Sequence, residues 1–317
     1  MKQKPPARCA LRRKGSAAKR LAAGARMCKA HSLFYYFTER ISMKKEKSFL
    51  KRLLLIGWIV LMIVEAARLL GGTKEEDAVS MGAGAWTQDA SEAEAFLEKL
   101  AETNSYVAAI YENKDSYPQA LLTALANNTE MIEFVKGYLT AEPVATGGFS
   151  EEELAVEFPL LLQWDKRWGY VEYGSNNIGV AGCGPTCLSM VILALTGNED
   201  ATPDKVAAYS EENGYYVKGA GTAWSFMTEG AEAYGLRAEE ISLDKEVMQD
   251  CLDNGNPIIC AMRKGDFTTA GHFIVIYGYD ENGFMVNDPN SISRSGMQWD
   301  FATLKGQIKN LWSYGSR

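Results

Sequence analysis

Two residues that lie far apart in the sequence, Cys183 and His272, are of the types that together perform nucleophilic thiol chemistry. Cys183 begins an apolar segment, 183–195, which predicts a buried helix with Pro185 in its first turn. A cysteine at a helix N-terminus lies beside unpaired backbone N–H groups and the positive end of the helix dipole, and both favour the thiolate. Cys183 is therefore the candidate nucleophile.

A cysteine nucleophile requires a base, and His272 is the single histidine after residue 31. It follows Gly271 and begins a predicted strand, 272–279. Taken alone, a histidine at the end of a strand is more often an ordinary surface or core residue than a catalytic one. Its combination with a cysteine at a helix N-terminus favours catalysis, because cysteine chemistry draws that pair from distant parts of a chain.

Asp288 directly follows a second predicted strand, 284–287, and its carboxylate could accept the imidazole N–H of His272. Such a contact would fix the tautomer of the ring and favour its protonated form. The alternative is that Asp288 is the first residue of an Asp-Pro turn and has no chemical role.

The strand register sets a condition on this contact. A four-residue turn at 280–283 would place Asp288 opposite Val275, which lies three residues, or roughly 10 Å, along the strand from His272. The sequence therefore predicts that a bulge near Gly278 or a strong strand twist closes the gap.

Gln163 stands 20 residues before Cys183, at the end of an apolar run. A neutral amide near the nucleophile could donate a hydrogen bond to an oxyanion, alongside the backbone N–H of Cys183. The alternative is a solvated glutamine at the junction of a strand and a loop.

The remaining cysteines predict neither a metal site nor a disulfide framework. The chain has six cysteines, no Cys-x-x-Cys and two histidines, so no familiar zinc spacing can be assembled and we expect no metal and no cofactor. Cys187 lies among apolar residues of the predicted helix and is expected to be a small buried hydrophobic residue.

The C-terminal part, residues 156–317, mixes predicted helices and strands and favours an α+β fold. Further helices are predicted at 203–214, 223–234 and 245–254, and a further strand at 258–262. The preceding part, 73–155, predicts a polar linker followed by two or three short helices, with a capping box formed by Ser91 and Glu94. These helices either pack on the following domain or act as a spacer.

The charge distribution is strongly asymmetric. Residues 1–52 contain 16 Lys and Arg against two acidic residues, whereas the rest of the 317-residue chain contains 17 basic and 38 acidic residues. The acidic part argues against nucleic acid as a partner, because phosphate binding requires clustered basic residues. With 47% hydrophobic and 23% charged residues, the chain is neither disordered nor a protein with many membrane spans.

The apolar segment 53–70 explains the asymmetry as an N-terminal transmembrane helix. Basic residues directly before it predict that the N-terminus, 1–52, stays in the cytoplasm and that the C-terminal domain is extracytoplasmic. We favour an uncleaved anchor, because no small-x-small cleavage site follows. A signal peptide that is cleaved to release a secreted protein, and a buried core helix, are the alternatives.

Residues 1–42 differ from the rest of the chain, with 11 basic residues against one acidic residue. Met43 begins the segment Met-Lys-Lys-Glu-Lys just before the apolar run, as an initiator methionine of an exported protein does. Our hypothesis is that translation starts at Met43. The alternative is a genuine basic cytoplasmic tail.

Four elements together resemble the papain-like cysteine peptidases of the bacteriocin-leader (double-glycine) type, in their stand-alone bacterial form. The resemblance covers about residues 156–317. The elements are Leu162-Gln163-Trp-Asp-Lys-Arg-Trp168, Gly182-Cys183-Gly-Pro-Thr, Gly271-His272-Phe-Ile-Val and Val286-Asn-Asp288-Pro.

The resemblance implies a papain-like α+β fold in which the cysteine-bearing helix packs on an antiparallel sheet. It implies Cys183 as nucleophile, His272 as general base and acid, Asp288 as the group that orients the imidazole, and Gln163 as the oxyanion-hole amide. Transporter-fused members place the glutamine only a few residues before the cysteine, so the longer separation here is a departure from their pattern.

The expected function is that of a membrane-anchored extracytoplasmic cysteine peptidase that cleaves exported peptides or cell-envelope protein. Two alternatives stay open on the sequence alone. One is a cell-envelope amidase or transferase that uses the same residues, and the other is an inactive papain-like binding module.

Overall fold

The structure of the protein is a computed structural model that describes residues 84–316. The chain divides into two units, Met1–Glu75 and Glu76–Arg317, and every element named below belongs to the second. The basic segment 1–52, the proposed start at Met43 and the apolar segment 53–70 lie outside the described residues. Across residues 84–316, no helix is both long enough and apolar enough to cross a bilayer.

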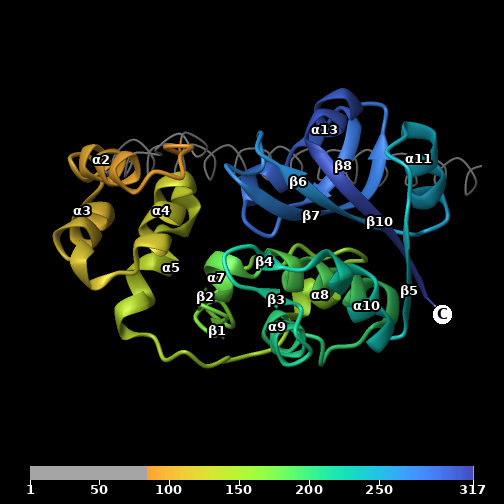
Figure 1. Cartoon of the computed structure of the whole chain (residues 1–317), viewed down its shortest axis with the longest axis horizontal. Helices are drawn as coiled ribbons and strands as arrows, with labels where there is room; N and C mark the ends of the chain where they lie inside the picture. The colour runs from red at the N-terminus through yellow and green to blue at the C-terminus, as the bar shows by residue number, and fades with distance from the viewer. Residues whose placement is uncertain (1–83, 317) are drawn as a thin grey trace, which may run out of the picture. The chain divides into compact units, whose positions relative to one another are not determined.

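A six-stranded antiparallel sheet forms the centre of the C-terminal part (Figure 1). Its order from edge to edge is β5-β10-β6-β7-β8-β9. The strands are β5 Leu236–Glu240, β6 Ile258–Arg263, β7 Gly271–Asp280, β8 Gly283–Asn287, β9 Gln298–Trp299 and β10 Ile308–Ser316. Strands β6, β7 and β8 confirm the sequence prediction. Strands β5, β9 and β10 lie outside it, because polar residues interrupt their apolar alternation.

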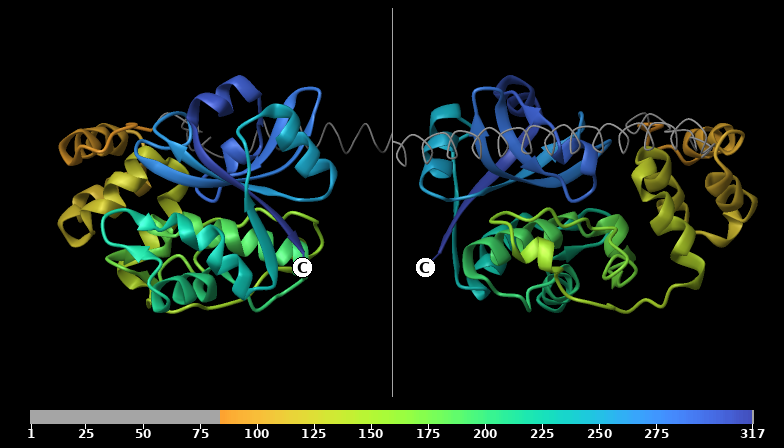
Figure 2. Two further views of the ribbon diagram at one scale, coloured as in Figure 1. Left: turned by 45° about the vertical axis from the view of Figure 1, so that its right-hand side comes forward. Right: turned by 180° about the vertical axis from the view of Figure 1, so that it is seen from behind.

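Helices cover both faces of this sheet (Figures 1 and 2). The helix that begins at Cys183, α8, packs on β7 and β10, whereas α11 packs on β6 and β7. The α+β class expected from the sequence is therefore confirmed. The helices are α6 Glu151–Leu154, α7 Ile178–Ala181, α8 Cys183–Thr196, α9 Pro203–Glu212, α10 Glu229–Ala233, α11 Lys245–Asp253, α12 Ile292–Ser295 and α13 Phe301–Gln307, with a 3₁₀ turn η4 at Trp224–Met227. Two short hairpins complete this part, β1 Glu172–Tyr173 with β2 Asn176–Asn177 and β3 Tyr216–Val217 with β4 Gly221–Thr222.

Strand β7 separates two hydrophobic cores. Phe273 and Val275 belong to the core that contains most of the buried side of α8. Ile274 and Ile276 belong to the second core, together with Met248 of α11. This alternation follows from the two-residue period of a strand. The helix that begins at Cys183 and the strand that carries His272 are therefore both anchored in packed cores.

The sequence prediction for the cysteine-bearing helix is accurate to one residue. The predicted segment 183–195 is α8, which ends at Thr196. Gly197 follows with φ of 64°, the left-handed conformation that glycine adopts without steric cost at the end of a helix.

The strand pair β7–β8 contains a bulge, one of the two features that the sequence predicts could close the gap between His272 and Asp288. The register shifts by one residue at Tyr277, next to the expected Gly278. Asn287 therefore takes the place opposite Val275. The next residue, Asp288, lies one position nearer to the start of β7 than a regular register would put it.

The helical region, which we define as residues 84–141, contains four α-helices rather than two or three. They are α2 Ala90–Ala101, α3 Ser105–Glu112, α4 Gln119–Asn127 and α5 Ile132–Gly137, with 3₁₀ turns η1 Lys114–Ser116, η2 Thr129–Met131 and η3 Tyr138–Thr140. The predicted capping box of Ser91 and Glu94 is wrong. Asp89 caps α2 by accepting the N–H groups of Ser91 and Glu92, while Glu94 pairs with Lys114.

The helical region packs on the C-terminal part. Phe134 of α5 stacks on Tyr170 with ring centroids 4.4 Å apart, and the Tyr170 hydroxyl donates to the Phe134 carbonyl at 2.9 Å. Tyr170 is accordingly a member of the hydrophobic core of the helical region. A spacer held away from the domain would not make these contacts.

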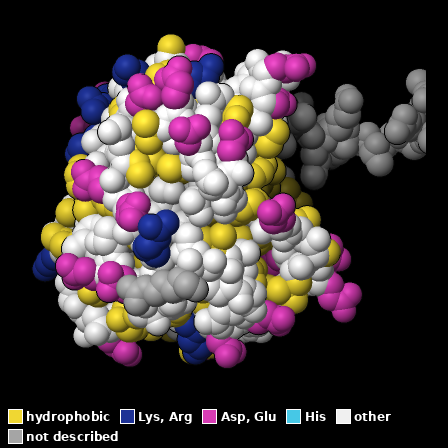
Figure 3. Space-filling view, turned by 90° about the vertical axis from the view of Figure 1, so that its right-hand side faces the viewer, with side chains coloured by type: hydrophobic (Ala, Val, Ile, Leu, Met, Phe, Trp, Pro, Cys, Tyr) yellow, Lys and Arg dark blue, Asp and Glu magenta, His cyan; other side chains and the backbone are white. Residues whose placement is uncertain are grey.

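The surface of this unit reflects its acidic composition. Figure 3 shows one face of the molecule, on which Asp and Glu side chains are spread and hydrophobic side chains lie between them. On this face the acidic side chains are therefore spread out rather than gathered in one patch.

Cys187 provides a test of the packing of α8. Its side chain is fully buried among aliphatic residues. Cys187→Ser should lower the free energy of unfolding by about 1–3 kcal/mol, because the hydroxyl would be buried without a designed partner. Denaturant unfolding measures the change. Cys251→Ser, at a half-buried position of α11, is the control and should cost clearly less.

Candidate active site

Cys183 is the first residue of α8, and its side chain is half-buried. The glycines on either side allow the close packing that holds it. A Cβ on Gly182 would lie 2.5 Å from Cγ2 of Ile178, and a Cβ on Gly184 would lie 2.8 Å from Oγ1 of Thr222. The nucleophile candidate is therefore fixed between α7 and the β3–β4 hairpin, as the Gly-Cys-Gly sequence permits.

His272 and Asp288 form a buried hydrogen bond. The Nε2 atom of His272 lies 2.7 Å from Oδ1 of Asp288, and the aspartate side chain is fully buried. With Nε2 engaged, Nδ1 is the ring atom left for the Cys183 thiol, which lines the same cleft and is one of the groups that raise the pKa of His272. The structure thus brings together three residues that are 89 and 16 positions apart in the sequence.

The groups around the imidazole of His272 counteract the effect of burial on its pKa. Desolvation disfavours the protonated ring, but the charge of Asp288, its hydrogen bond and the contact with Cys183 together raise the pKa of His272 to about 9. Burial also acts against the Asp288 carboxylate, yet His272 and Arg294 outweigh it and lower the pKa of that group. The arrangement favours a protonated imidazole beside an ionised carboxylate at neutral pH.

Arg294 is a member of the site that the sequence did not reveal. Its Nε atom donates to Oδ2 of Asp288 at 2.5 Å, so the carboxylate faces a cation or imidazole on each oxygen. The backbone N–H of Asn290 also donates to Oδ1 of Asp288, at 2.8 Å. Only an indirect argument could have predicted a residue such as Arg294. A buried carboxylate that binds a histidine with one oxygen requires a donor for the other oxygen.

Gln163 lines the same cleft as Cys183 and is nearly fully buried. Its Nε2 atom donates to the Gly179 carbonyl at 2.9 Å, and its backbone N–H donates to the Pro289 carbonyl at 2.7 Å. An amide nitrogen has two hydrogens, so one remains for a group in the cleft. The second contact also ties the glutamine to the residue that follows Asp288.

A cleft with a volume of about 490 Å³ contains Cys183, His272 and Gln163 in its lining. None of its lining residues is Asp, Glu, Lys or Arg, and amides and threonines are frequent among them. One part of the lining comes from the helical region, which the sequence did not associate with the site. These residues are Trp86, Gln88, Ala90, Gln119, Ala120, Thr123, Ala124 and Asn127.

The segment that enters the helical region is tied to the edge of this cleft. Trp86 donates its indole N–H to the Gly265 carbonyl at 3.0 Å, and the Gln88 amide bonds to Thr269. Trp86 has φ of 53°, a left-handed conformation that is rare for a large side chain. The loop before β7 and the start of the helical region therefore form one rim.

Cys187 and Cys260 differ from Cys183 in being fully buried. Burial raises the pKa of the Cys187 thiol well above its usual value, and it does the same to Cys260. Cys183, Cys187, Cys251 and Cys260 are all free thiols. Within residues 84–316 no group of His, Cys, Asp and Glu side chains could hold a metal ion.

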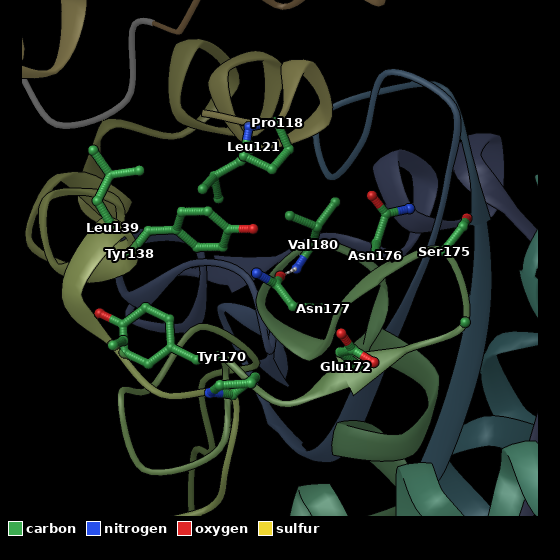
Figure 4. A pocket seen from close by; sticks show the side chains of 13 residues that line it. Pro118, Leu121, Tyr138, Leu139, Tyr170, Glu172, Ser175, Asn176, Asn177 and Val180 are labelled. Carbon is green, nitrogen blue, oxygen red and sulfur yellow. Dashed lines mark hydrogen bonds between the residues drawn. The ribbon is translucent and has the colours of Figure 1, made fainter. Parts of the chain in front are cut away.

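A second hollow of similar volume lies between the helical region and the β1–β2 hairpin (Figure 4). Tyr138, Leu139 and Tyr170 line one side of it, and Asn177 bonds to the Val180 backbone N–H at 3.0 Å on the other. Its lining contains no cysteine or histidine. The nucleophile candidate belongs to the first cleft alone.

Two of the solved structures that match this chain each cover 43% of it. The peptidase domain of Streptococcus ComA, a bifunctional ABC transporter involved in a quorum-sensing pathway, is 22% identical over 43% of this chain and 93% of that domain, with a TM-score of 0.34. A Bacillus anthracis protein described as a C39-like peptidase is 17% identical over 43% of this chain and 90% of its own, with a TM-score of 0.29. A search of curated proteins gives no significant match.

The family assignment rests on a sequence model of the whole C-terminal part. The model described as the Peptidase_C39-like family matches residues 155–317, slightly more than half of the chain. This range contains the cysteine helix, the β7–β8 pair and the turn after it. The protein belongs to the Peptidase_C39-like family.

Proposed function

We propose that the protein is a cysteine peptidase that hydrolyses peptide bonds at Cys183. The observation that carries the proposal is that Cys183, at the start of α8, lines the same cleft as His272, whose Nε2 atom is bonded to buried Asp288. Family membership supports the peptidase class.

Cys183 acts as the nucleophile. The thiolate forms an ion pair with the His272 imidazolium and attacks the scissile carbonyl carbon, which becomes tetrahedral. The developing oxyanion accepts hydrogen bonds from the Cys183 backbone N–H and from the Gln163 side chain, which the Gly179 carbonyl holds in place.

His272 acts first as general acid and then as general base. It transfers its proton to the leaving amine as the carbon–nitrogen bond breaks and the acyl-enzyme forms. It then accepts a proton from water, which attacks the thioester and releases the carboxylic acid product. Asp288 keeps the ring oriented and stabilises its charge, a role that the 2.7 Å contact supports.

The proposed setting is the outer side of a bacterial membrane. Segment 53–70 is apolar and follows a basic segment, which favours an anchor with the domain outside. The substrate is then an exported peptide or a cell-envelope protein. The lining of the cleft, which lacks charged side chains other than His272, favours an uncharged peptide segment at the scissile bond.

The first test compares two cysteines of one helix. Cys183→Ala should abolish activity and alkylation while the free energy of unfolding changes by no more than about 1 kcal/mol, because the sulfur lies in a cleft. Cys187→Ser should still be alkylated at Cys183. Iodoacetamide labelling followed by peptide mass mapping gives the site. Labelling at Cys187, or turnover by Cys183→Ala, would contradict the assignment and favour a binding module.

The second test concerns pH. Leaving-group protonation requires the imidazolium, so kcat/KM should fall as the pH rises through about 9, the pKa of His272. The raised pKa also means that the contribution of His272 to stability is complete below about pH 6.5 and is lost as the pH rises through about 9. Rate and unfolding measurements from pH 5 to pH 10 check both.

Asp288→Asn extends this test. Loss of the carboxylate should move the alkaline limb of the rate profile down by about 1–3 pH units. It should also destabilise the fold by about 3–5 kcal/mol, because Arg294 loses its partner in a buried site. The double variant Asp288→Asn, Arg294→Gln should recover stability but not the profile. An unchanged limb in Asp288→Asn would remove Asp288 from the mechanism.

The third test concerns the helical wall of the cleft, by which we mean the lining residues that come from the helical region. Thr123 of α4 is half-buried and lines the cleft. Thr123→Trp should slow labelling by a peptide-sized thiol reagent about tenfold, whereas iodoacetamide should react at nearly the wild-type rate. Glu98→Trp, on the exposed surface of α2, is the control. Equal rates with both reagents would exclude this wall from the substrate path.

A further inference from the structure

Glu130, in the helical region, binds the turn that joins Asp288 to Arg294. We propose that Glu130 is a positioning residue of the active site, which holds the turn 291–293 and thereby fixes Asp288 and Arg294 behind His272. The inference rests on the proposed function. It also makes a segment outside the family match, 155–317, part of the catalytic unit.

The Glu130 carboxylate accepts four hydrogen bonds from this turn. Oε1 accepts from Oγ of Ser291 at 2.9 Å, from the backbone N–H of Ser293 at 3.1 Å and from Oγ of Ser293 at 2.6 Å. Oε2 accepts from the backbone N–H of Ile292 at 2.6 Å. The acid therefore satisfies the first donors of α12, where a negative charge is stabilised.

The turn transmits this placement to both charged residues. The backbone N–H of Asp288 donates to Oγ of Ser295 at 2.9 Å, and the same hydroxyl donates to the Ser291 carbonyl at 2.7 Å. The Ser291 side chain in turn accepts from the Arg294 N–H at 3.2 Å. Displacement of residues 291–293 would therefore move Asp288 and Arg294 together.

Asn290, the residue just before the turn 291–293, is held by a side chain next to Glu130. The side-chain amide of Asn128 donates to the Asn290 carbonyl, and its oxygen accepts from the Glu130 N–H at 3.0 Å. Trp164 donates to the same Asn290 carbonyl at 3.1 Å. Asn128, which caps η2, and Glu130, within η2, thus bind four consecutive residues, 290–293.

Few charged groups surround His272. A displacement of the turn 291–293 should therefore be visible in the titration of the imidazole. Cys183 faces the ring from α8, and Asp288 faces it from the end of β8. Arg294 of α12 faces the other oxygen of Asp288. Glu130 bonds to the turn rather than to any of these groups, so its effect on the imidazole must pass through the positions of Asp288 and Arg294.

Glu130→Gln in the full chain tests the inference. The amide keeps the size of the side chain but replaces one acceptor oxygen by an NH₂ group, which faces donors. We expect kcat to fall about tenfold with KM changed less than about twofold, and the alkaline limb of the kcat/KM profile to move to lower pH. The matched control is Glu133→Gln, since Glu133 lies nearby and pairs with exposed Lys136 and Lys166.

A double-variant cycle identifies the contact. Ser293→Ala removes one hydroxyl donor to Glu130 and should have a smaller effect of the same kind. In the Glu130→Gln background it should add little, because the shared contact is already weakened. Where Glu130→Gln does not accumulate as folded protein, the rate and pH profile of Ser293→Ala decide the question.

The outcomes separate this inference from the proposed function. An unreactive Cys183 in the wild-type protein would overturn both. If the wild-type protein is reactive and active, and Glu130→Gln has the same kcat and the same pH profile, the positioning role alone would be overturned. A Glu130→Gln variant that loses thermal stability but keeps both readouts would also overturn it, because the contact would then be structural.

Discussion

The architecture of the site depends on one buried carboxylate. Asp288 is fully enclosed, and an ionised group in such a place requires charged or hydrogen-bonding partners on each oxygen. His272 and Arg294 supply them from opposite sides. The bulge in β7, the short helix α12 and the contacts from the helical region all serve to place this carboxylate against the imidazole.

The second constraint is the start of α8. Cys183 must approach the ring without a capping side chain in the way, and Gly182 supplies no side-chain cap. The helix is held by its packing on β7, the strand that also carries His272. Because the candidate nucleophile and the candidate base lie on two elements of one core, their separation is set by side-chain packing rather than by a loop.

The sequence predicted the parts of this arrangement that local chemistry determines. Residue type and position made candidates of Cys183, His272, Asp288 and Gln163. Counting along the strands called for either a bulge or a strong twist, and the structure has a bulge at Tyr277. Contacts between distant segments left no local pattern. Arg294 lies in a polar turn, and the cleft-lining residues of α4 read as a small amphipathic helix, so their roles emerged only from tertiary structure.

Arg294 also limits how strongly Asp288 can hold the proton on His272. A lone buried carboxylate at hydrogen-bonding distance would stabilise the imidazolium by several kcal/mol even at an effective dielectric constant of about 20. Such an acid would transfer its proton to the leaving amine reluctantly. The guanidinium withdraws part of this stabilisation, because it occupies the other oxygen of the same carboxylate. Arg294 lowers the pKa of the Asp288 carboxyl, and in the proposed mechanism the turn between the two residues positions the carboxylate that holds the imidazole.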